Sequence, residues 1–276
     1  MTVVVKIGGA RAVDPGGALA DVAALCADGT DVVVVHGGST AVDDALERMG
    51  IEPDYVETPG GVVGRFTDAE TMDVFTMAMA GRVNTGLVAG LRAEGVDAVG
   101  LSGVDGGLLT GPRKSAVRVL EDGKKKIRRG DHSGTIEAVN GGLLGTLLEA
   151  GYAPVVSPPM LADEGTPVNT DADRAAAAVA AELGATLVSL TDVSGVYRDP
   201  EDASTRIERV DTPAAYEDLT EAAEGFMSRK VMAATEALEG GASGVVIADA
   251  NVEEPVRSAL EGEGTHVLPD AIERDR

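Results

Sequence analysis

The sequence predicts an α/β fold, a three-layer αβα sandwich built around a mostly parallel central sheet. Short aliphatic runs alternate with segments of helical periodicity, as expected for the β-α units that form a parallel sheet. Hydrophobic residues make up 44% of the 276 positions, whereas aromatic residues make up 3% and tryptophan is absent. Val, Leu, Ala and Ile must therefore form the core, which suits strands buried on both faces.

The first elements follow from local patterns. Val3–Ile7 and 32–35 are predicted strands, and each ends in a Gly-Gly pair. Apolar residues three and four positions apart predict a helix after each strand. The first helix is indicated by Leu19, Val22, Ala23 and Cys26, and the second by Val42, Ala45, Leu46 and Met49. A capping-box spacing predicts a longer helix that ends near Arg92 and begins at Thr67-Asp68-Ala69-Glu70.

Downstream, the alternation continues. Further strands are expected at 98–101, 154–157, 186–190, 245–248 and 266–268, and further helices at 171–183, about 226–239 and about 252–261. One basic β-hairpin is inserted: Ser115–Leu120 alternates like a strand, Asp122-Gly123 is a turn signal, and Lys124–Arg129 is the predicted return strand. We expect a single domain over residues 1–276, with an N-terminal lobe (about 1–165) and a C-terminal lobe (about 166–276).

The net charge of the chain indicates which partners are excluded and which salt conditions suit the protein. The formal net charge is −23, with 46 acidic residues against 23 basic ones. A surface this acidic argues against general nucleic-acid binding, which needs basic patches. We interpret the charge as halophilic adaptation to concentrated salt, which screens the self-repulsion.

Cysteine usage and the start of the chain suggest a cytoplasmic protein. Cys26 is the single cysteine, which excludes an internal disulfide and a cysteine-based zinc site, and its predicted role is to fill the core. The chain opens on a predicted strand rather than on a signal peptide. No apolar run approaches the roughly 20 residues of a membrane span, so no membrane association is expected.

The glycine pairs that end the first two predicted strands have two interpretations. They are ordinary tight turns, or they let backbone amides approach a phosphate beyond the carboxyl ends of parallel strands. The sequence contains no Walker A motif and no GxGxxG after a strand. A P-loop and a dinucleotide-binding fold therefore lack support.

Lysines are rare, so isolated ones are informative. The chain has six, and four of them lie between positions 114 and 126. Lys6 sits within an apolar strand, between Val5 and Ile7, where a solvated surface charge is not expected. Lys230 taken alone is an ordinary surface lysine at the start of a predicted helix.

Five motifs occur in an order that resembles the amino-acid kinase family, and within it the acetylglutamate kinase branch. They span nearly the whole chain: Lys6-Ile7-Gly8-Gly9, His36-Gly37-Gly38, Asn169-Thr170-Asp171-Ala172-Asp173, Leu190-Thr191-Asp192-Val193-Ser194-Gly195-Val196 and Gly225-Phe226-Met227-Ser228-Arg229-Lys230. Two stretches look more like the [LysW]-aminoadipate/[LysW]-glutamate kinases of that branch, namely Gly64-Arg65-Phe66-Thr67-Asp68 and Lys124–Asp131. Those enzymes act on an amino acid attached to a small acidic carrier protein.

The resemblance implies a role for each matching residue. Lys6 and Lys230 neutralise the transferring phosphoryl group, and Asp173 orients both. Phosphate or substrate oxygens are held by amides of Gly8, Gly9, Gly37 and Gly38, and the α-carboxylate of the substrate by Arg65 and Asn169. The nucleotide is bordered by Thr191, Asp192, Val193, Gly195, Tyr197 and Met227. It also implies an N-terminal substrate lobe, a C-terminal nucleotide lobe and ATP with Mg²⁺ as co-substrate, without a protein-held metal. Phe226 replaces the commoner glycine of the family and puts the seating of the nucleotide by that loop in doubt.

The expected reaction is phosphorylation of a side-chain carboxylate. A carboxylate is ionised at pH 7 and needs no general base, so His36 is expected to position the glycines rather than to act as a base. Three alternatives stay open: a plain N-acetylglutamate kinase, a kinase for another acid such as carbamate, aspartate or uridylate, and a non-catalytic nucleotide sensor. Glutamate and 2-aminoadipate differ by one methylene, which is worth only about 1–3 kcal/mol of discrimination.

The basic hairpin suggests a docking site for the acidic carrier. Residues 113–129 hold eight of the 23 basic residues and two acidic ones, a local balance of +6. A solvated hairpin with a protected sheet edge is the simpler interpretation. The scarcity of lysine elsewhere favours docking, through Lys124, Lys125, Lys126, Arg128 and Arg129. We also expect a homodimer, because no segment before the first strand could form the helix that links some acetylglutamate kinases into hexamers.

Overall fold

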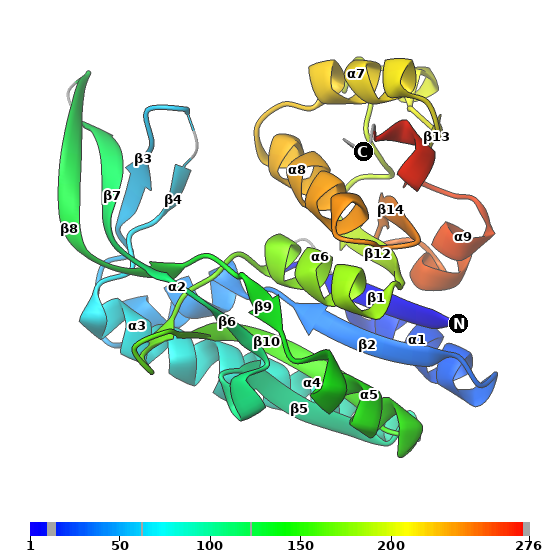
Figure 1. The fold of residues 1–276 in the computed structure, drawn as a ribbon, viewed down its shortest axis with the longest axis horizontal. Helices are drawn as coiled ribbons and strands as arrows, with labels where there is room; N and C mark the ends of the chain where they lie inside the picture. Colours follow the sequence, from blue (N-terminus) through cyan, green and yellow to red (C-terminus); the bar gives the residue numbers. More distant parts are fainter. Residues whose placement is uncertain (10–14, 62, 122, 273–276) are drawn as a thin grey trace.

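The computed structural model describes residues 1–9, 15–61, 63–121 and 123–272, and these form an eleven-stranded sheet between layers of helices (Figure 1). The strand order along the sheet is β13 (Arg209–Val210), β15 (Thr265–Val267), β14 (Gly244–Asp249), β12 (Thr186–Thr191), β1 (Thr2–Ile7), β2 (Asp31–His36), β10 (Ala153–Ala162), β6 (Leu109–Gly111) and β9 (Ala138–Val139). Two further strands also pair with β10, namely β5 (Ala98–Gly103) and β11 (Pro167–Val168).

The sheet is mostly parallel, which confirms the predicted fold class. Strand β1 runs parallel to β2 and β12, β10 runs parallel to β2, β5 and β6, and β12 runs parallel to β14. The antiparallel pairs lie toward the edges, at β14–β15, β6–β9 and β10–β11. Because β1 and β2 are parallel neighbours, the two glycine pairs that follow them leave the sheet at the same edge.

Helices cover both faces of the sheet, and the alternation along β1 assigns each side chain to a face. Val3, Val5 and Ile7 pack in a cluster with α1 (Pro15–Ala27), α4 (Asn84–Ala93) and α9 (Pro255–Glu261). Val4 packs on the other face, in a cluster with α5 (Gly141–Glu149), α6 (Ala172–Leu183), α7 (Pro213–Ala222) and α8 (Phe226–Glu239). Lys6 shares the face of Val4 by the two-residue period of a strand, so it points toward α6 and α8.

A second cluster of helices stands beside the sheet. The α2 helix (Ser39–Arg48) packs against α3 (Ala69–Thr76), and a π-helical segment, η1 (Met77–Val83), joins α3 to α4. Short 3₁₀ turns complete the described helical segments: η2 (Asp105–Gly107), η3 (Ala203–Thr205) and η4 (Pro269–Ala271). The helix predicted to end near Arg92 therefore ends at Ala93, but its N-cap is Asp68, whose side chain accepts from the Thr71 N–H, and not Thr67.

One described helix is long and apolar enough to cross a membrane by length and composition alone, which the search for an unbroken apolar run did not detect. The continuous helix Ala69–Ala93 has 25 residues and a mean hydropathy of 1.2 in its most apolar window. Its apolar residues are spaced among polar ones, so the sequence contains no unbroken apolar run there. The buried ones pack inside the protein, where Phe75 and Met79 contact the α2 cluster and Leu87 and Leu91 contact the sheet.

Two antiparallel hairpins stand away from the sheet, together at the left of Figure 1. One joins β3 (Tyr55–Glu57) to β4 (Val63–Arg65), and the other joins β7 (Arg113–Glu121) to β8 (Lys124–Gly134). The second confirms the predicted basic hairpin and extends it at both ends. Asp122 of the predicted turn lies outside the described residues.

Cys26 is only partly buried, although it packs against the α1 face of the core as predicted. Burial and the nearby Asp31 carboxylate raise the pKa of its thiol.

Candidate active site

Two lysines from different elements meet one carboxylate. Lys6 Nζ, from β1, lies 2.6 Å from Asp173 Oδ1, and Lys230 Nζ, from α8, lies 3.4 Å from the same oxygen. Asp173 is in the first turn of α6, whose N-cap is Asp171: the Asp171 side chain accepts from the N–H groups of Asp173 and Arg174. The structure thus brings together the three predicted catalytic residues.

The electrostatics of this cluster are coupled. Burial by itself would raise the pKa of Asp173, but the Lys6 and Lys230 ammonium groups outweigh it, and the pKa is lowered. Burial and the neighbouring Lys6 lower the pKa of Lys230, while Asp173 opposes them. One carboxylate between two cations leaves a net positive charge, which is what a bound phosphoryl group requires.

The glycine pairs touch each other. A Cβ added at Gly9 would lie 2.0 Å from the Gly38 nitrogen, and a Cβ at Gly38 would lie 2.5 Å from Met79 Sδ. Gly9 therefore requires glycine because it meets backbone, whereas a side chain at Gly38 would displace the Met79 side chain. The Gly37 N–H donates to Ile7 O at 3.0 Å, so it is committed to the backbone. The sequence had predicted that this amide would bind a ligand oxygen. Gly38 is the N-cap of α2 and has no side-chain cap, so the positive end of this helix is open.

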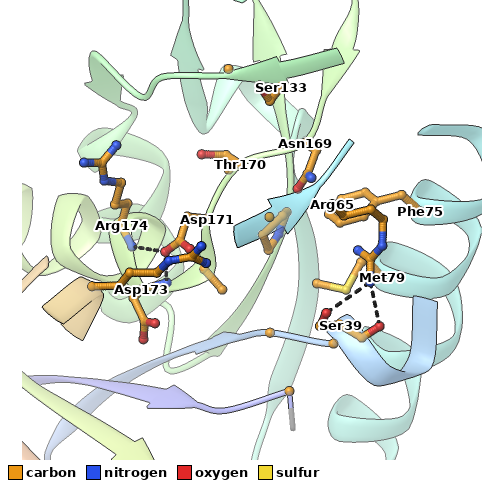
Figure 2. Close-up of a pocket in the computed structure, with 18 of the residues that line it drawn as sticks. Ser39, Arg65, Phe75, Met79, Ser133, Asn169, Thr170, Asp171, Asp173 and Arg174 are labelled. Carbon is orange, nitrogen blue, oxygen red and sulfur yellow. Dashed lines mark hydrogen bonds between the residues drawn. The ribbon is translucent and has the colours of Figure 1, made fainter. Parts of the chain in front are cut away.

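A cavity of about 660 Å³ lies in front of this cluster, and Figure 2 shows its two sides. Arg65 and Ser39 lie on one side with Phe75 and Met79, and Asp173 lies on the other with Asp171 and Arg174. Lys6, Gly9, Gly37, Gly38 and Asn169 also line it. The cavity therefore joins the predicted phosphate residues to the predicted substrate residues.

Arg65 is held in place by a network of hydrogen bonds, in which its own side chain is largely buried. Its Nη2 lies 2.7 Å from Asp43 Oδ1 and its Nε 3.2 Å from the same oxygen, and Nη2 also donates to Ser39 O. Tyr55 donates from its hydroxyl to Asp43 Oδ2, and the guanidinium carbon lies 5.5 Å from the Tyr55 ring centroid. No described residue occupies Nη1 of Arg65, which leaves that edge of the fork for an anion.

Asn169 and the predicted nucleotide residues have separate surroundings. Asn169 Nδ2 donates to Thr67 Oγ1 at 3.0 Å. The nucleotide residues gather elsewhere, where β12 ends and α8 begins, and do not line the 660 Å³ cavity: Thr191, Asp192, Val193, Gly195, Tyr197 and Met227. Gly195 has φ 144°, and a Cβ there would lie 2.7 Å from Thr265 Oγ1, so this loop needs glycine. Gly8 follows β1 directly, and the side chain of Phe226 lies outside the description.

The comparisons with known proteins identify the family of this chain. Residues 1–249 match the model of the amino acid kinase family. The chain belongs to this family. It is 45% identical to the [LysW]-aminoadipate kinase of Thermus thermophilus over 271 residues, covering 96% of this chain and 99% of the relative. It is also 45% identical to the acetylglutamate kinase of Methanopyrus kandleri, over 240 residues that cover 86% of this chain and 91% of that one.

Solved structures show the same fold. The N-acetylglutamate synthase of Neisseria gonorrhoeae superposes with a TM-score of 0.75 at 25% identity, over 97% of this chain, but this chain spans only 59% of the synthase chain. The carbamate kinase of Giardia superposes with a TM-score of 0.65 at 17% identity, over 98% of this chain and 99% of that one. Both confirm the α/β sandwich of this amino acid kinase.

The five hairpin cations of this kinase that were predicted to dock the carrier fall into two groups. Lys126 Nζ pairs with Glu121 at 2.8 Å, and Arg128 pairs with Asp54 and stacks on the Phe66 ring, 3.9 Å from its centroid. The second group is exposed and has no ion-pair partner among the described residues, and it consists of Lys124, Lys125 and Arg129. The structure therefore gives Arg128 a structural contact between the two hairpins.

Several cavity residues were not predicted from the sequence: Ser39, Asp43, Tyr55, Lys114, Arg174 and Arg229. Ser39, Asp43 and Tyr55 come from α2 and β3, which pack together only in the folded chain. Lys114 carried a signal, because it belongs to the basic segment and is one of six lysines. Through Lys114, the base of the hairpin borders the cavity.

Proposed function

We propose that this protein uses ATP to phosphorylate the side-chain carboxylate of a glutamate or 2-aminoadipate that is attached to a small acidic carrier protein of the LysW type. The product is an acyl phosphate for lysine biosynthesis, arginine biosynthesis or both. The observation that carries the proposal is the Lys6–Asp173–Lys230 cluster, of which Lys6 and Asp173 line a glycine-lined cavity bordered by the basic hairpin. The [LysW]-aminoadipate kinase name of the Thermus relative supports the choice of substrate.

In the proposed reaction a carboxylate oxygen attacks the γ-phosphorus of ATP, an O–P bond forms, and the bond to the β-phosphate oxygen breaks to release ADP. The carboxylate is already ionised, so no proton has to be removed. Catalysis then depends on alignment and on charge neutralisation. Lys6 and Lys230 supply positive charge, and Asp173 fixes their positions. The amides of Gly9 and Gly38, for which the described part of the chain provides no acceptor, donate to phosphoryl or carboxylate oxygens.

The nucleotide is proposed to lie against the loop that follows β12 and the first turn of α8. In this position its triphosphate points from Thr191–Tyr197 and Met227 toward the two lysines. Mg²⁺ would arrive with the nucleotide and neutralise phosphate charge. The described residues contain no group of three or more His, Cys, Asp or Glu side chains that could hold a metal ion.

The acceptor is proposed to lie between Arg65 and the lysines. Arg65, fixed by Asp43, binds the free α-carboxylate of the amino acid through its remaining edge, with Asn169 as a second donor. The substrate side chain then reaches toward Gly38 and Lys6. The division into an N-terminal substrate lobe (about 1–165) and a C-terminal nucleotide lobe (about 166–276) belongs to the same proposal.

The carrier is proposed to dock on the basic hairpin. An acidic partner that approaches a chain of net charge −23 meets repulsion everywhere except over a segment such as 113–129. The exposed Lys124, Lys125 and Arg129 would make the first contacts, while Arg128 holds the hairpin against Asp54. A homodimer, a cytoplasmic location and a requirement for high salt are parts of the proposal that light scattering, fractionation and unfolding measurements test.

Steady-state kinetics with three acceptors test the substrate. The acceptors are the carrier charged with glutamate, the carrier charged with 2-aminoadipate, and free N-acetylglutamate. We expect kcat/KM to be highest for a charged carrier. Faster turnover of free N-acetylglutamate would make the protein an acetylglutamate kinase, and nucleotide binding without turnover of any acceptor would make it a nucleotide sensor.

A further inference from the structure

A buried polar pair connects the long helix to the substrate glycines. His36 is the last residue of β2, and Asn84 is the first residue of α4, directly after the π-helical segment η1. Their exposures are 1% and 4%, and the two residues are 48 positions apart in the sequence. A π-helical segment is rare and often occurs beside a functional site. Neither residue has a part in the mechanism described above.

The hydrogen bonds of this pair define the tautomer of the imidazole. Asn84 Nδ2 lies 2.8 Å from Val155 O and 3.1 Å from His36 Nε2. The amide cannot be flipped, because Asn84 Oδ1 would then face the Val155 carbonyl oxygen, and two acceptors repel. An amide nitrogen only donates, so His36 Nε2 accepts and the ring proton lies on Nδ1. Nδ1 therefore donates to Gly37 O, at 2.9 Å.

Space for this arrangement comes from a glycine on the neighbouring strand. A Cβ at Gly100, on β5, would lie 2.1 Å from Asn84 Oδ1, so any other residue there would displace the amide. Burial lowers the pKa of His36 to about 4, against the Gly37 hydrogen bond, so the ring is neutral at pH 7. His36 does not line the 660 Å³ cavity, which excludes direct proton transfer to the acceptor from its present position.

Because the Gly37–Gly38 peptide is trans, the orientation of Gly37 O also sets the direction of the Gly38 N–H. The carbonyl and the N–H of one trans peptide point to opposite sides of the chain. The described cis bond is Pro158–Pro159, so the Gly37–Gly38 peptide is trans. Holding Gly37 O toward His36 therefore turns the Gly38 N–H away from it. Gly38 lines the cavity, its N–H has no described partner, and it begins α2.

We propose that Asn84 and His36 are positioning residues that fix the Gly37–Gly38 peptide so that the Gly38 N–H faces the reacting anion. The identity of that anion rests on the function proposed above. If the Asn84 donor is removed, the imidazole can carry its proton on Nε2. An unprotonated Nδ1 would then face Gly37 O, and the repulsion favours rotation of the peptide. The cavity would lose a donor and gain a carbonyl oxygen.

The first arm of the test needs no substrate. Imidazole ¹⁵N resonances of the three histidines, assigned with His36→Gln, report tautomer and charge directly. We expect His36 of the unmodified protein to be neutral with the proton on Nδ1 from about pH 6 to about pH 8. A proton on Nε2, or a charged ring at about pH 6, would overturn the proposal even if the substrate is identified incorrectly.

The second arm uses Asn84→Leu and Asn84→Asp with whichever acceptor is turned over. Loss of one preorganised donor predicts that kcat falls roughly 100-fold while the KM for ATP stays within about twofold. Asn84→Asp should be no better than Asn84→Leu, because a carboxylate accepts from Nε2–H and favours the wrong tautomer.

Asp21, a buried carboxylate that does not line the cavity, provides the stability control. Asp21→Ala removes the acceptor for the Val256 and Arg257 N–H groups and should lower the melting temperature without lowering kcat. A folded Asn84→Leu protein with normal kcat would refute the positioning role.

Discussion

The ammonium group of Lys6 lies 2.6 Å from Asp173 Oδ1, although the two residues are 167 positions apart in the sequence. The contact forms because β1 places Lys6 on the face covered by α6. Asp171 is the N-cap of α6, and this places Asp173 in the first turn of that helix. Lys230 reaches the same carboxylate from α8. This triangle is the basis for the first two predictions.

Replacing either lysine should affect turnover more than binding. We expect Lys6→Ala and Lys230→Ala each to lower kcat roughly 100-fold or more, with a smaller change in the KM for either substrate, because their charges act mainly on the transition state. Asp173→Asn should behave similarly, since it releases both lysines. Arg209→Ala, at an exposed ion pair, is the control and should change nothing. A lysine variant with near-normal kcat would remove that lysine from the mechanism.

The pH profile should report the depressed pKa of Lys230. Its ordinary value is 10.5, and burial and Lys6 lower it, so kcat should fall on the alkaline side below pH 10.5 as Lys230 loses its charge. Asp173 raises this pKa, so Asp173→Asn should move the alkaline limb to lower pH. Folding should show the opposite trend for this group, because the desolvation cost of a charged Lys230 disappears above its folded pKa. Parallel kcat and thermal unfolding profiles distinguish titration from unfolding, and an alkaline limb that Asp173→Asn leaves in place would contradict this assignment.

Arg65 should determine the affinity for the acceptor. Arg65→Lys loses the planar fork and should raise the KM for the acceptor roughly tenfold, while the KM for ATP is unchanged. Asp43→Asn should act in the same direction but more weakly, because it leaves the guanidinium in place and removes only its charged anchor. Equal effects on ATP and acceptor would place Arg65 at the nucleotide instead.

Carrier docking should depend on the exposed hairpin cations. Changing Lys124, Lys125 and Arg129 together to glutamine should lower kcat/KM for the charged carrier roughly tenfold or more and weaken its salt dependence, with ATP affinity unchanged. A matched triple variant removes the same charge elsewhere, at the exposed Arg92, Arg198 and Arg209. If both triple variants turn over the carrier equally well, the hairpin is not the docking site.

Salt should stabilise the fold. A net charge of −23 repels itself, and the Debye length falls from about 10 Å at 0.1 M salt to about 3 Å at 1 M. Thermal unfolding should therefore shift to higher temperature as potassium chloride is raised over this range, whereas sucrose at equal osmolality should give a smaller shift. A melting temperature that is already maximal at low salt would contradict the halophilic interpretation.

The sequence alone determined the elements whose signal is local. Continuous aliphatic runs located β1 and β2, alternation located the basic hairpin, and helical periodicity located α1 and α8, because each of these patterns follows directly from which faces of an element are buried. The short strands β3 and β4 carried no such pattern, because each has three residues and little burial. The N-cap was assigned one residue early, as Thr67 and Asp68 are both good capping residues and only the folded backbone selects Asp68.

Only the tertiary structure decided how the site is held together. The sequence pointed to Lys6 because lysine is rare in this chain, and the resemblance to the amino-acid kinase family pointed to Asp173, Lys230 and Arg65. It gave no sign that Asp43 anchors Arg65 or that Asn84 sets the tautomer of His36, since each pair is separated by tens of residues and meets only through packing of helices on the sheet. It also could not show that the Gly37 amide donates to Ile7 O while the Gly38 amide has no acceptor among the described residues, because that depends on the register of β1 and β2. Chemical identity is local in the chain, but the direction of each donor is set by long-range contacts.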